Sequence, residues 1–327
     1  MRLTAWDPEA ASWFADVDAD GPVVAPAATG FTFTEGPVWC PRLAGGAGLL
    51  FSDIPEDTIF RWRPGAARAE VWRRPSGQSN GLTLDREGRL LVCEHERRRV
   101  SRSRIEGPAL YGSEPVVLAE RCGGGRLNSP NDIIARSDGT IFFTDPTYGL
   151  RDAYGERAAE HEEQPARAVY RIRPGQAAAV PALPSRPQPA PPEPEVAAVG
   201  FTQPNGLALS GDEATLYVGD SAEGNLRAFR VAADGTLSDG RVVHAFDRSA
   251  GRGNPDGMRL DAAGRLWSTG PGGLWVLAGD GRPLAHLRFP EVTANLAWAE
   301  DGRTLCVTAT TTLYRVRTTV GGAAGRP

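Results

Sequence analysis

The sequence predicts an all-β protein, a six-bladed β-propeller with four-stranded blades, and three observations carry this prediction. The first is a recurring phrase: a polar residue, usually followed by Gly, opens an apolar strand, and a turn and a second β-rich strand follow. The second is that no stretch has the pattern of a long amphipathic helix. The third is the number and spacing of the copies, which begin at Glu35, Asn80, Asn131, Asn205, Asp256 and Asn295, at intervals of 45, 51, 74, 51 and 39 residues. Repeats of this period, with two strands per copy and room for two more, are typical of propeller blades.

The blades can be assigned in order along the 327 residues, which we expect to form a single domain. Residues 1–30 are a lead-in that could close the ring, and the alternating segment Phe31–Thr34 is a candidate strand for pairing with the last blade. The strands of the first blade are predicted at 35–39, 49–53, 58–62 and near 70–74. In the second blade the first two strands are predicted at 80–84 and 90–95.

The third blade has a stretched interval, which two insertions explain. Residues 146–167 are too long for a hairpin, and long loops on a rigid scaffold often shape a binding site, so Tyr148 in this loop is a candidate substrate contact. Residues 181–195 are rich in proline and are predicted to be a surface insertion that forms no ladder strand. The last three blades follow the phrase regularly, and the tail at 318–327 is expected to be flexible.

The composition excludes several functions. A formal net charge of -4 argues against a nucleic-acid binder, for which a basic face is the usual footprint. No apolar run is long enough to span a membrane, and residues 1–20 lack the apolar stretch of a signal peptide. The sequence contains no lysine, which excludes a Schiff base on that side chain. We therefore expect a cytoplasmic protein, a monomer or weak homo-oligomer, that acts on a small molecule.

The first residue of each phrase is expected to line the central channel, so the six residues would form a ring of oxygen-bearing side chains. Asn or Asp before Gly also suits tight turns, which explains Asn80 and Asn295 but not Glu35. Two carboxylates and several amides that converge without a cation would repel one another or stay unsatisfied. Because all these ligands are oxygen, the sequence predicts one divalent ion, Ca²⁺ in the first place, with Mg²⁺, Mn²⁺ or Zn²⁺ as alternatives.

Six phrases in the correct order, spread between residues 31 and 316, resemble the SMP-30/gluconolactonase family. They are EGPVW (35–39), SDIP (52–55), SPND (129–132), FTDP (143–146), PNGL (204–207) and PDG (255–257). The resemblance implies a six-bladed propeller that hydrolyses sugar lactones with one catalytic divalent metal. It also implies the metal ligands Glu35, Asn205 and Asp256, with Asn131 as a further ligand or substrate contact, and Arg126 as a substrate contact.

The chemistry of such a site predicts a mechanism. The metal would polarise the lactone carbonyl while water attacks its carbon. Asp256 is the preferred general base, and His95, whose ordinary pKa lies nearer neutrality, is the alternative. Asn80 in the ring is a further candidate substrate contact.

Three other readings remain open. The metal could serve a different substrate, such as a phosphotriester or an intermediate of a specialised pathway, or the protein could be a Ca²⁺-stabilised binding scaffold without catalysis. The stretch Gly77-Gln78-Ser79-Asn80-Gly81 also matches the G-x-S-x-G nucleophile elbow. That elbow requires a helix after the serine, whereas a strand is predicted here, which argues against a serine hydrolase.

Overall fold

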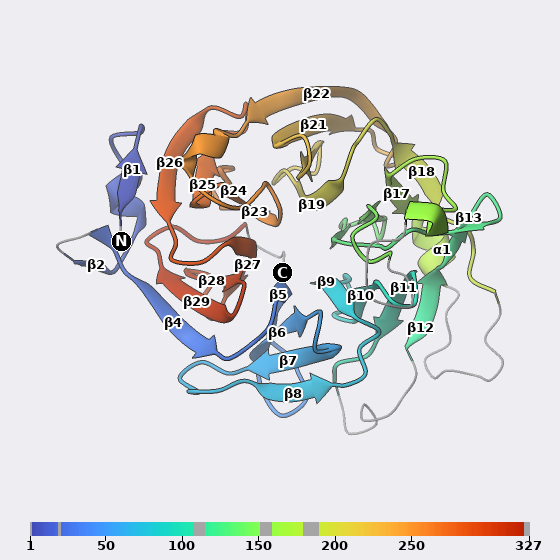
Figure 1. Cartoon of the computed structure of the whole chain (residues 1–327), viewed down its shortest axis with the longest axis horizontal. Helices are drawn as coiled ribbons and strands as arrows, with labels where there is room; N and C mark the ends of the chain where they lie inside the picture. The colour runs from blue at the N-terminus through green and yellow to red at the C-terminus, as the bar shows by residue number, and fades with distance from the viewer. Residues whose placement is uncertain (1, 19–20, 107–114, 151–158, 179–189, 324–327) are drawn as a thin grey trace.

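The predicted six-bladed β-propeller is confirmed. The structure is a computed structural model that describes residues 2–18, 21–106, 115–150, 159–178 and 190–323. Its six sheets surround a central axis (Figure 1), and the first strand of each blade lies nearest that axis. Within the described residues the helices are short: α1 (Pro174–Ala178) and the 3-10 turns η1 (Ala10–Trp13), η3 (Ala159–His161) and η4 (Arg248–Ala250). None of the described helices is long and apolar enough to cross a membrane.

Each blade is an antiparallel sheet, and apart from the outermost strands β1 and β4 its strands follow chain order from the axis outward. The first blade contains β5 (Thr34–Cys40), β6 (Gly48–Asp53), β7 (Thr58–Trp62) and β8 (Glu70–Arg73). The second contains β9 (Ser79–Leu84), β10 (Leu90–Glu94), β11 (Arg99–Ser103) and β12 (Val116–Ala119). The third contains β15 (Ile133–Ala135), β16 (Ile141–Asp145), β17 (Ala168–Ile172) and β18 (Glu195–Ala198). The fourth and fifth are β19 (Pro204–Leu209), β20 (Thr215–Asp220), β21 (Asn225–Val231), β22 (Leu237–Ala245); and β23 (Met258–Leu260), β24 (Leu266–Gly270), β25 (Gly273–Leu277), β26 (Pro283–Arg288). The sixth contains β27 (Thr293–Ala299), β28 (Thr304–Ala309) and β29 (Thr312–Arg317). Two small hairpins, β2 (Val17–Asp18) with β3 (Gly21–Pro22) and β13 (Arg121–Cys122) with β14 (Gly125–Arg126), lie outside the blades.

The fourth strand of the sixth blade comes from the N-terminal part of the chain. It is β4 (Val24–Thr29), which pairs antiparallel with β29, and β1 (Leu3–Ala5) adds a fifth strand to the fifth blade. The closing segment is therefore not Phe31–Thr34, as the alternation predicted. Backbone amides of Thr32 and Phe33 donate to the Asp53 carboxylate at 2.9 and 3.0 Å, so this segment leads into β5 instead.

The hydrophobic core lies between blades, with one buried cluster at each of the six interfaces of the described ring. Successive side chains of a strand point to opposite faces, and here both faces are covered. Phe142 packs against the fourth blade and the adjacent Phe143 against the second. This is why the second strands read as continuous apolar runs rather than as alternating patterns.

The structure describes only parts of the proline-rich insertion and of the C-terminal tail. Residues 181–189 of the proline-rich insertion lie outside the described residues; 190–194 carry no regular structure, and β18 begins at Glu195. The expected flexible tail is held where it is described, because the Thr319 amide donates to the Trp13 carbonyl and the Gly322 amide to the Gly302 carbonyl, both at 2.9 Å. Residues 324–327 of that tail lie outside the described part.

Candidate metal centre and active site

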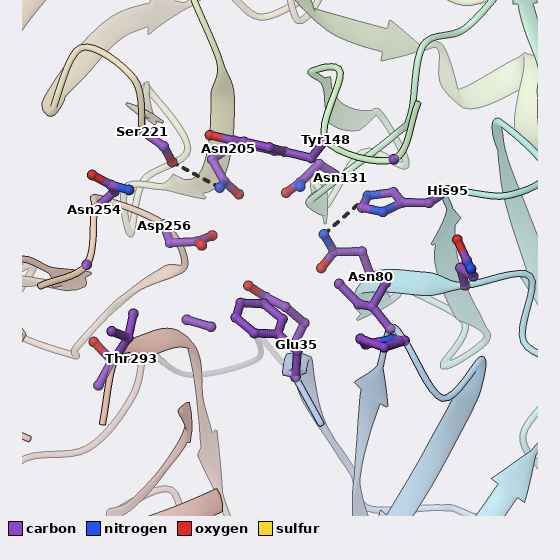
Figure 2. Close-up of a pocket in the computed structure, with 18 residues that line it drawn as sticks. Glu35, Asn80, His95, Asn131, Tyr148, Asn205, Ser221, Asn254, Asp256 and Thr293 are labelled. Carbon is purple, nitrogen blue, oxygen red and sulfur yellow. Dashed lines mark hydrogen bonds between the residues drawn. The ribbon is translucent and has the colours of Figure 1, made fainter. Parts of the chain in front are cut away.

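A cavity of about 540 Å³ opens at the axis and is lined by residues from all six blades. Its volume is in the range of small-molecule sites. Five of the six ring residues line it, and Figure 2 shows their side chains converging: Glu35, Asn80, Asn131, Asn205 and Asp256. The sixth, Asn295, is not among the lining residues. The repeat phrase thus brings one polar side chain from each of five blades to a common space.

The glycines of the phrase allow the inner strands to approach this closely. A Cβ on Gly206 would lie 1.8 Å from the Asp256 carbonyl oxygen of the next blade, and one on Gly36 would lie 2.1 Å from the Asn80 carbonyl oxygen. Gly81 and Gly257 are equally close to the ring residues Asn131 and Asn295. Among these four glycines only Gly36 has a positive φ, 51°. The glycine is therefore required chiefly for contact between blades, and turn conformation does not explain the phrase.

Asn205 presents an oxygen atom to the cavity. Its Nδ2 donates to Ser221 Oγ at 3.0 Å, and Ser221 Oγ donates to the Pro255 carbonyl at 2.6 Å. These bonds fix which end of the amide points inward. The Asn205 Oδ1 atom is buried and has no hydrogen-bond partner among the described residues, and a buried polar atom without a partner is costly. The Asn205 side chain is therefore oriented so that its oxygen can bind a cation or accept a hydrogen bond in the cavity.

Glu35 and Asp256 place two carboxyl groups beside that oxygen (Figure 2). Burial raises the pKa of Glu35 to about 7, against a bond from the Gly36 amide. Burial raises the pKa of Asp256 well above its ordinary value, and the charge of Glu35 raises it further. Two neighbouring buried carboxylates repel each other, so without a cation at least one of them tends to keep a proton. A cation that replaced this proton would allow both groups to ionise.

These residues fit a divalent metal ion. The donors are carboxylate and amide oxygens, which suit hard cations such as Ca²⁺. The orphaned Asn205 Oδ1 and the facing carboxyl groups provide oxygen ligands from three blades. Asn131 lies at the rim of the same group, and its backbone amide is held by the Thr144 carbonyl at 2.8 Å. The set would leave positions for water or substrate.

Asn295 has a different role from the other ring residues. Its Nδ2 donates to Glu35 Oε2 at 3.1 Å, and its Oδ1 accepts from the Leu296 amide at 2.9 Å. Both ends of the amide are therefore used inside the protein. Asn295 orients the Glu35 carboxylate from beneath the cavity.

The second and third blades form a polar wall opposite Glu35 and Asp256. As the amide is oriented here, Asn80 Nδ2 donates to His95 Nε2 at 3.3 Å, so the His95 lone pair is engaged. His95 is 4% exposed, and the Gly149 backbone packs against its ring. Tyr148, in the long loop after β16, also lines the cavity. The three residues predicted from the sequence, Asn80, His95 and Tyr148, therefore all line the cavity.

Arg126 is not among the residues that line the cavity, contrary to the expectation that it contacts substrate. It lies in the β13–β14 hairpin, where its Nη2 donates to the Arg97 carbonyl at 3.0 Å. Its backbone amide donates to Glu163 at 2.9 Å. These bonds hold Arg126 at the edge of the third blade and away from the axis.

The serine of the G-x-S-x-G stretch is structural. Ser79 begins β9, so a strand follows it and no helix does. Its side chain is fully buried, with Oγ 2.9 Å from Ser52 Oγ. The elbow geometry is absent at this serine, in agreement with the sequence argument.

Sequence reasoning missed several polar residues of the site. Ser221, Asn254 and Thr293 line the cavity, and each lies one or two residues from a recognised phrase, which is the signal that could have found them. Asp132 and Arg259 are buried beneath the cavity and were not considered. The former directly follows a ring residue, so its position in the repeat could have marked it.

Comparison with known proteins gives a consistent result. Residues 33–311 match the family described as SMP-30/Gluconolactonase/LRE-like region. A gluconolactonase of Zymomonas mobilis is 29% identical over 321 residues, which cover 90% of this chain and 81% of that protein. A 6-deoxy-6-sulfogluconolactonase of Pseudomonas putida is 33% identical over 109 residues, 32% of this chain and 37% of that protein.

Solved structures extend the likeness. A gluconolactonase of Xanthomonas campestris superposes with a TM-score of 0.80 at 29% identity, covering 97% of this chain and 95% of that one. These relatives support a lactonase-type function.

Proposed function

The chain belongs to the SMP-30/gluconolactonase/LRE-like family, and on that premise we propose that it is a metal-dependent lactonase that opens a sugar lactone. The observation that carries the proposal is the arrangement of Asn205, whose buried Oδ1 faces the cavity beside two carboxyl groups and has no hydrogen-bond partner in the described part of the chain. A bound dication would polarise the lactone carbonyl and stabilise the charge that develops on its oxygen. Glu35, Asn205 and Asp256 would hold the ion, with Asn131 as a further ligand or a substrate contact.

Asp256 is proposed as the group that accepts the proton of the attacking water. It is deep in the protein, yet part of its side chain faces the cavity. It would accept the proton through a carboxylate oxygen that is not engaged with the ion. His95 is the weaker candidate because its Nε2 is engaged by Asn80 at 3.3 Å. Its proposed role is to hold the Asn80 amide toward the substrate.

The polar wall is proposed to bind substrate hydroxyl groups. Asn80, Asn131 and Tyr148 offer donors and acceptors on one side of the cavity. Phe33, Ile54 and Val292 provide an apolar lining on the other side. This arrangement suits a small ring that has hydroxyl groups on one face and carbon–hydrogen bonds on the other.

The first experiment measures acid release from a panel of five- and six-membered aldonolactones, with the uncatalysed opening subtracted. We expect turnover with added Ca²⁺ and its loss after chelation. Glu35→Gln should lose metal binding and turnover together while the far-ultraviolet circular dichroism stays unchanged. The matched control is Glu87→Gln, which makes the same chemical change on an exposed turn and should behave as the wild type.

Other outcomes would contradict parts of the proposal. Hydrolysis of a phosphotriester panel without lactone turnover would show that the enzyme acts on phosphotriesters and not on lactones. Metal binding without turnover of either panel would indicate a binding scaffold. Lactone turnover that survives chelation and Glu35→Gln would exclude the metal mechanism altogether.

The identity of the base is tested separately. Asp256→Asn should abolish turnover, and His95→Gln, which can keep a hydrogen bond to Asn80, should retain most of it. The reverse ranking would assign the proton to His95.

A further inference from the structure

The turn that carries Tyr148 is held by residues that lead into the third and fourth blades. It follows β16 and begins at Pro146, and Tyr148 lines the cavity. Figure 2 shows the Tyr148 side chain pointing from the third blade toward Asn205 of the fourth. The position of this turn therefore decides where one wall of the cavity lies.

Ser129 closes the turn with a single hydroxyl group. The Ser129 side chain is fully buried, and its Oγ donates to the Pro146 carbonyl at 2.7 Å and accepts from the Gly149 amide at 2.9 Å. In an ordinary β-turn, two backbone groups with this spacing would bond each other directly. Here the serine hydroxyl stands between them, so it fixes both ends of the segment that contains Tyr148.

Gln203 holds the same turn from the start of the fourth blade. Its Oε1 accepts from the Thr147 amide at 3.1 Å, and its Nε2 donates to Thr147 Oγ1 at 2.9 Å. Both residues are buried, and both ends of the Gln203 amide are engaged with the residue that precedes Tyr148. A further bond, from the Leu150 amide to the Thr147 carbonyl at 3.2 Å, closes the turn on its other side.

The turn also packs closely against the second blade. A Cβ on Gly149 would lie 2.6 Å from both Cβ and Cγ of His95 and 2.8 Å from Ser129 Cβ. The turn therefore has little room to move toward that side. Because segments with buried hydrogen bonds and dense contacts are the ones that open least, we expect Tyr148 to belong to a preformed wall and not to a closing lid.

We propose that Ser129 and Gln203 are positioning residues that fix the Tyr148 hydroxyl to recognise the hydroxyl group on the carbon next to the lactone carbonyl. Tyr148 points toward Asn205, whose oxygen faces the part of the cavity where that carbonyl would be bound. The substituent nearest to the carbonyl is therefore the one within reach of Tyr148, and a phenol can both donate to it and accept from it. The preferred substrates are lactones with a 2-hydroxyl group. This inference rests on the lactonase function proposed above.

The kinetic test compares a six-membered aldonolactone with its 2-deoxy analogue and with an analogue that lacks the hydroxyl farthest from the carbonyl. The wild type should prefer the parent over the 2-deoxy analogue in kcat/KM, because the analogue leaves a polar group of the site unpaired. Tyr148→Phe should lower this preference about tenfold. Ser129→Ala and Gln203→Leu should lower it at least about threefold, through KM with kcat nearly unchanged. The preference over the distal analogue should stay as in the wild type.

Two further measurements show whether Ser129 acts through Tyr148. In the Tyr148→Phe background, Ser129→Ala should change the preference for the 2-hydroxyl group by less than about twofold, because the phenol that it positions is already lost. Amide hydrogen exchange of the peptide that spans residues 146–150, measured without substrate, should be faster in Ser129→Ala and in Gln203→Leu than in the wild type.

Ser210→Ala is the matched control. The Ser210 Oγ also donates to an oxygen atom at 2.6 Å and accepts from a backbone amide at 2.9 Å, but it does so in the turn between β19 and β20. This variant removes the same kind of hydroxyl bridge away from the cavity. Its preference for the 2-hydroxyl group and its exchange at 146–150 should both match those of the wild type.

The outcomes separate this inference from the proposed function. A wild type that opens lactones, with unchanged exchange or an unchanged 2-hydroxyl preference in Ser129→Ala and Gln203→Leu, would overturn the inference alone. A loss of preference over the distal analogue in place of the 2-deoxy analogue would overturn it as well. If Ser129→Ala does not fold, Gln203→Leu decides by the same two measurements. A wild type that opens no lactone would overturn the proposed function itself.

Discussion

Asn205 and Asn295 occupy the same position of the repeat, yet the contacts of their side-chain amides differ. In Asn205 the amide nitrogen is held by Ser221, and the oxygen is left facing the cavity. In Asn295 the oxygen accepts from the Leu296 amide, and the nitrogen donates to Glu35. A repeat position therefore places a side chain near the axis, but the neighbouring residues decide whether it presents an oxygen to the cavity or supports another side chain that lines it.

The largest expected effect comes from exchanging the two asparagines for alanine. Asn205→Ala removes a proposed ligand, so kcat/KM for a lactone should fall on the order of 1,000-fold at a fixed Ca²⁺ concentration. Asn295→Ala leaves the ligands in place and should cost about 1–3 kcal/mol of unfolding free energy, with a smaller loss of activity. Steady-state kinetics and urea denaturation measure the two effects. Equal kinetic losses would contradict the division of roles.

The glycine that follows Asn205 offers the next test. Gly206→Ala places a Cβ 1.8 Å from the Asp256 carbonyl oxygen, so the free energy of unfolding should fall by about 3 kcal/mol or more. Gly211→Ala is the control, since a Cβ there meets nothing within 4 Å, and it should change stability by about 0.5 kcal/mol or less. A stable Gly206→Ala protein with unchanged metal affinity would refute the close-approach argument.

The pH dependence of the metal-free protein tests the carboxylate that Asn295 supports. The pKa of Glu35 is raised from 4.5 to about 7, so the folded state holds this proton after the unfolded chain has released it. The contribution is fully present below pH 4.5 and is lost as pH rises toward 7. The wild type should therefore lose about 3 kcal/mol more than Glu35→Gln between these pH values.

Denaturant titrations across this range measure the difference between the two proteins. The comparison with Glu35→Gln is needed because Asp145, whose pKa burial also raises to about 7, has the same trend in both. Saturating Ca²⁺ should remove only the extra decline of the wild type, so that its curve becomes parallel to that of Glu35→Gln. Parallel curves for the two metal-free proteins would contradict the assignment to Glu35.

The smallest effect is expected at the hydroxyl that orients Asn205. Ser221→Ala should weaken Ca²⁺ binding about tenfold, since supports of metal ligands typically contribute this much. Ser52→Ala is a close control because both serines donate to a carbonyl of the next blade, at 2.6 and 2.8 Å, but Ser52 holds no ring side chain. Calorimetric titration of both variants should separate them, and equal affinities would show that Asn205 needs no support.

The repeat made the ring residues predictable, because a polar residue before Gly marks the axis end of each inner strand. Arg126 was misplaced because it belongs to a hairpin outside the repeat, where spacing gives no direction. Within the lead-in at residues 1–30, the strand that closes the ring could not be located, because Val24–Thr29 contains a proline and three alanines, which are poor strand formers. Proline is tolerated there because β4 is an edge strand.

The union of β4 with β29 has a consequence for how the protein is made. β4 is synthesised before the blade strands β5 to β28, whereas its partner β29 is synthesised after all of them. β4 therefore stays without its partner strand until the five intervening sheets have been synthesised. Since Glu35 and Thr293 belong to the two blades that this late pairing joins, the cavity at the axis is complete only after β29 has paired with β4.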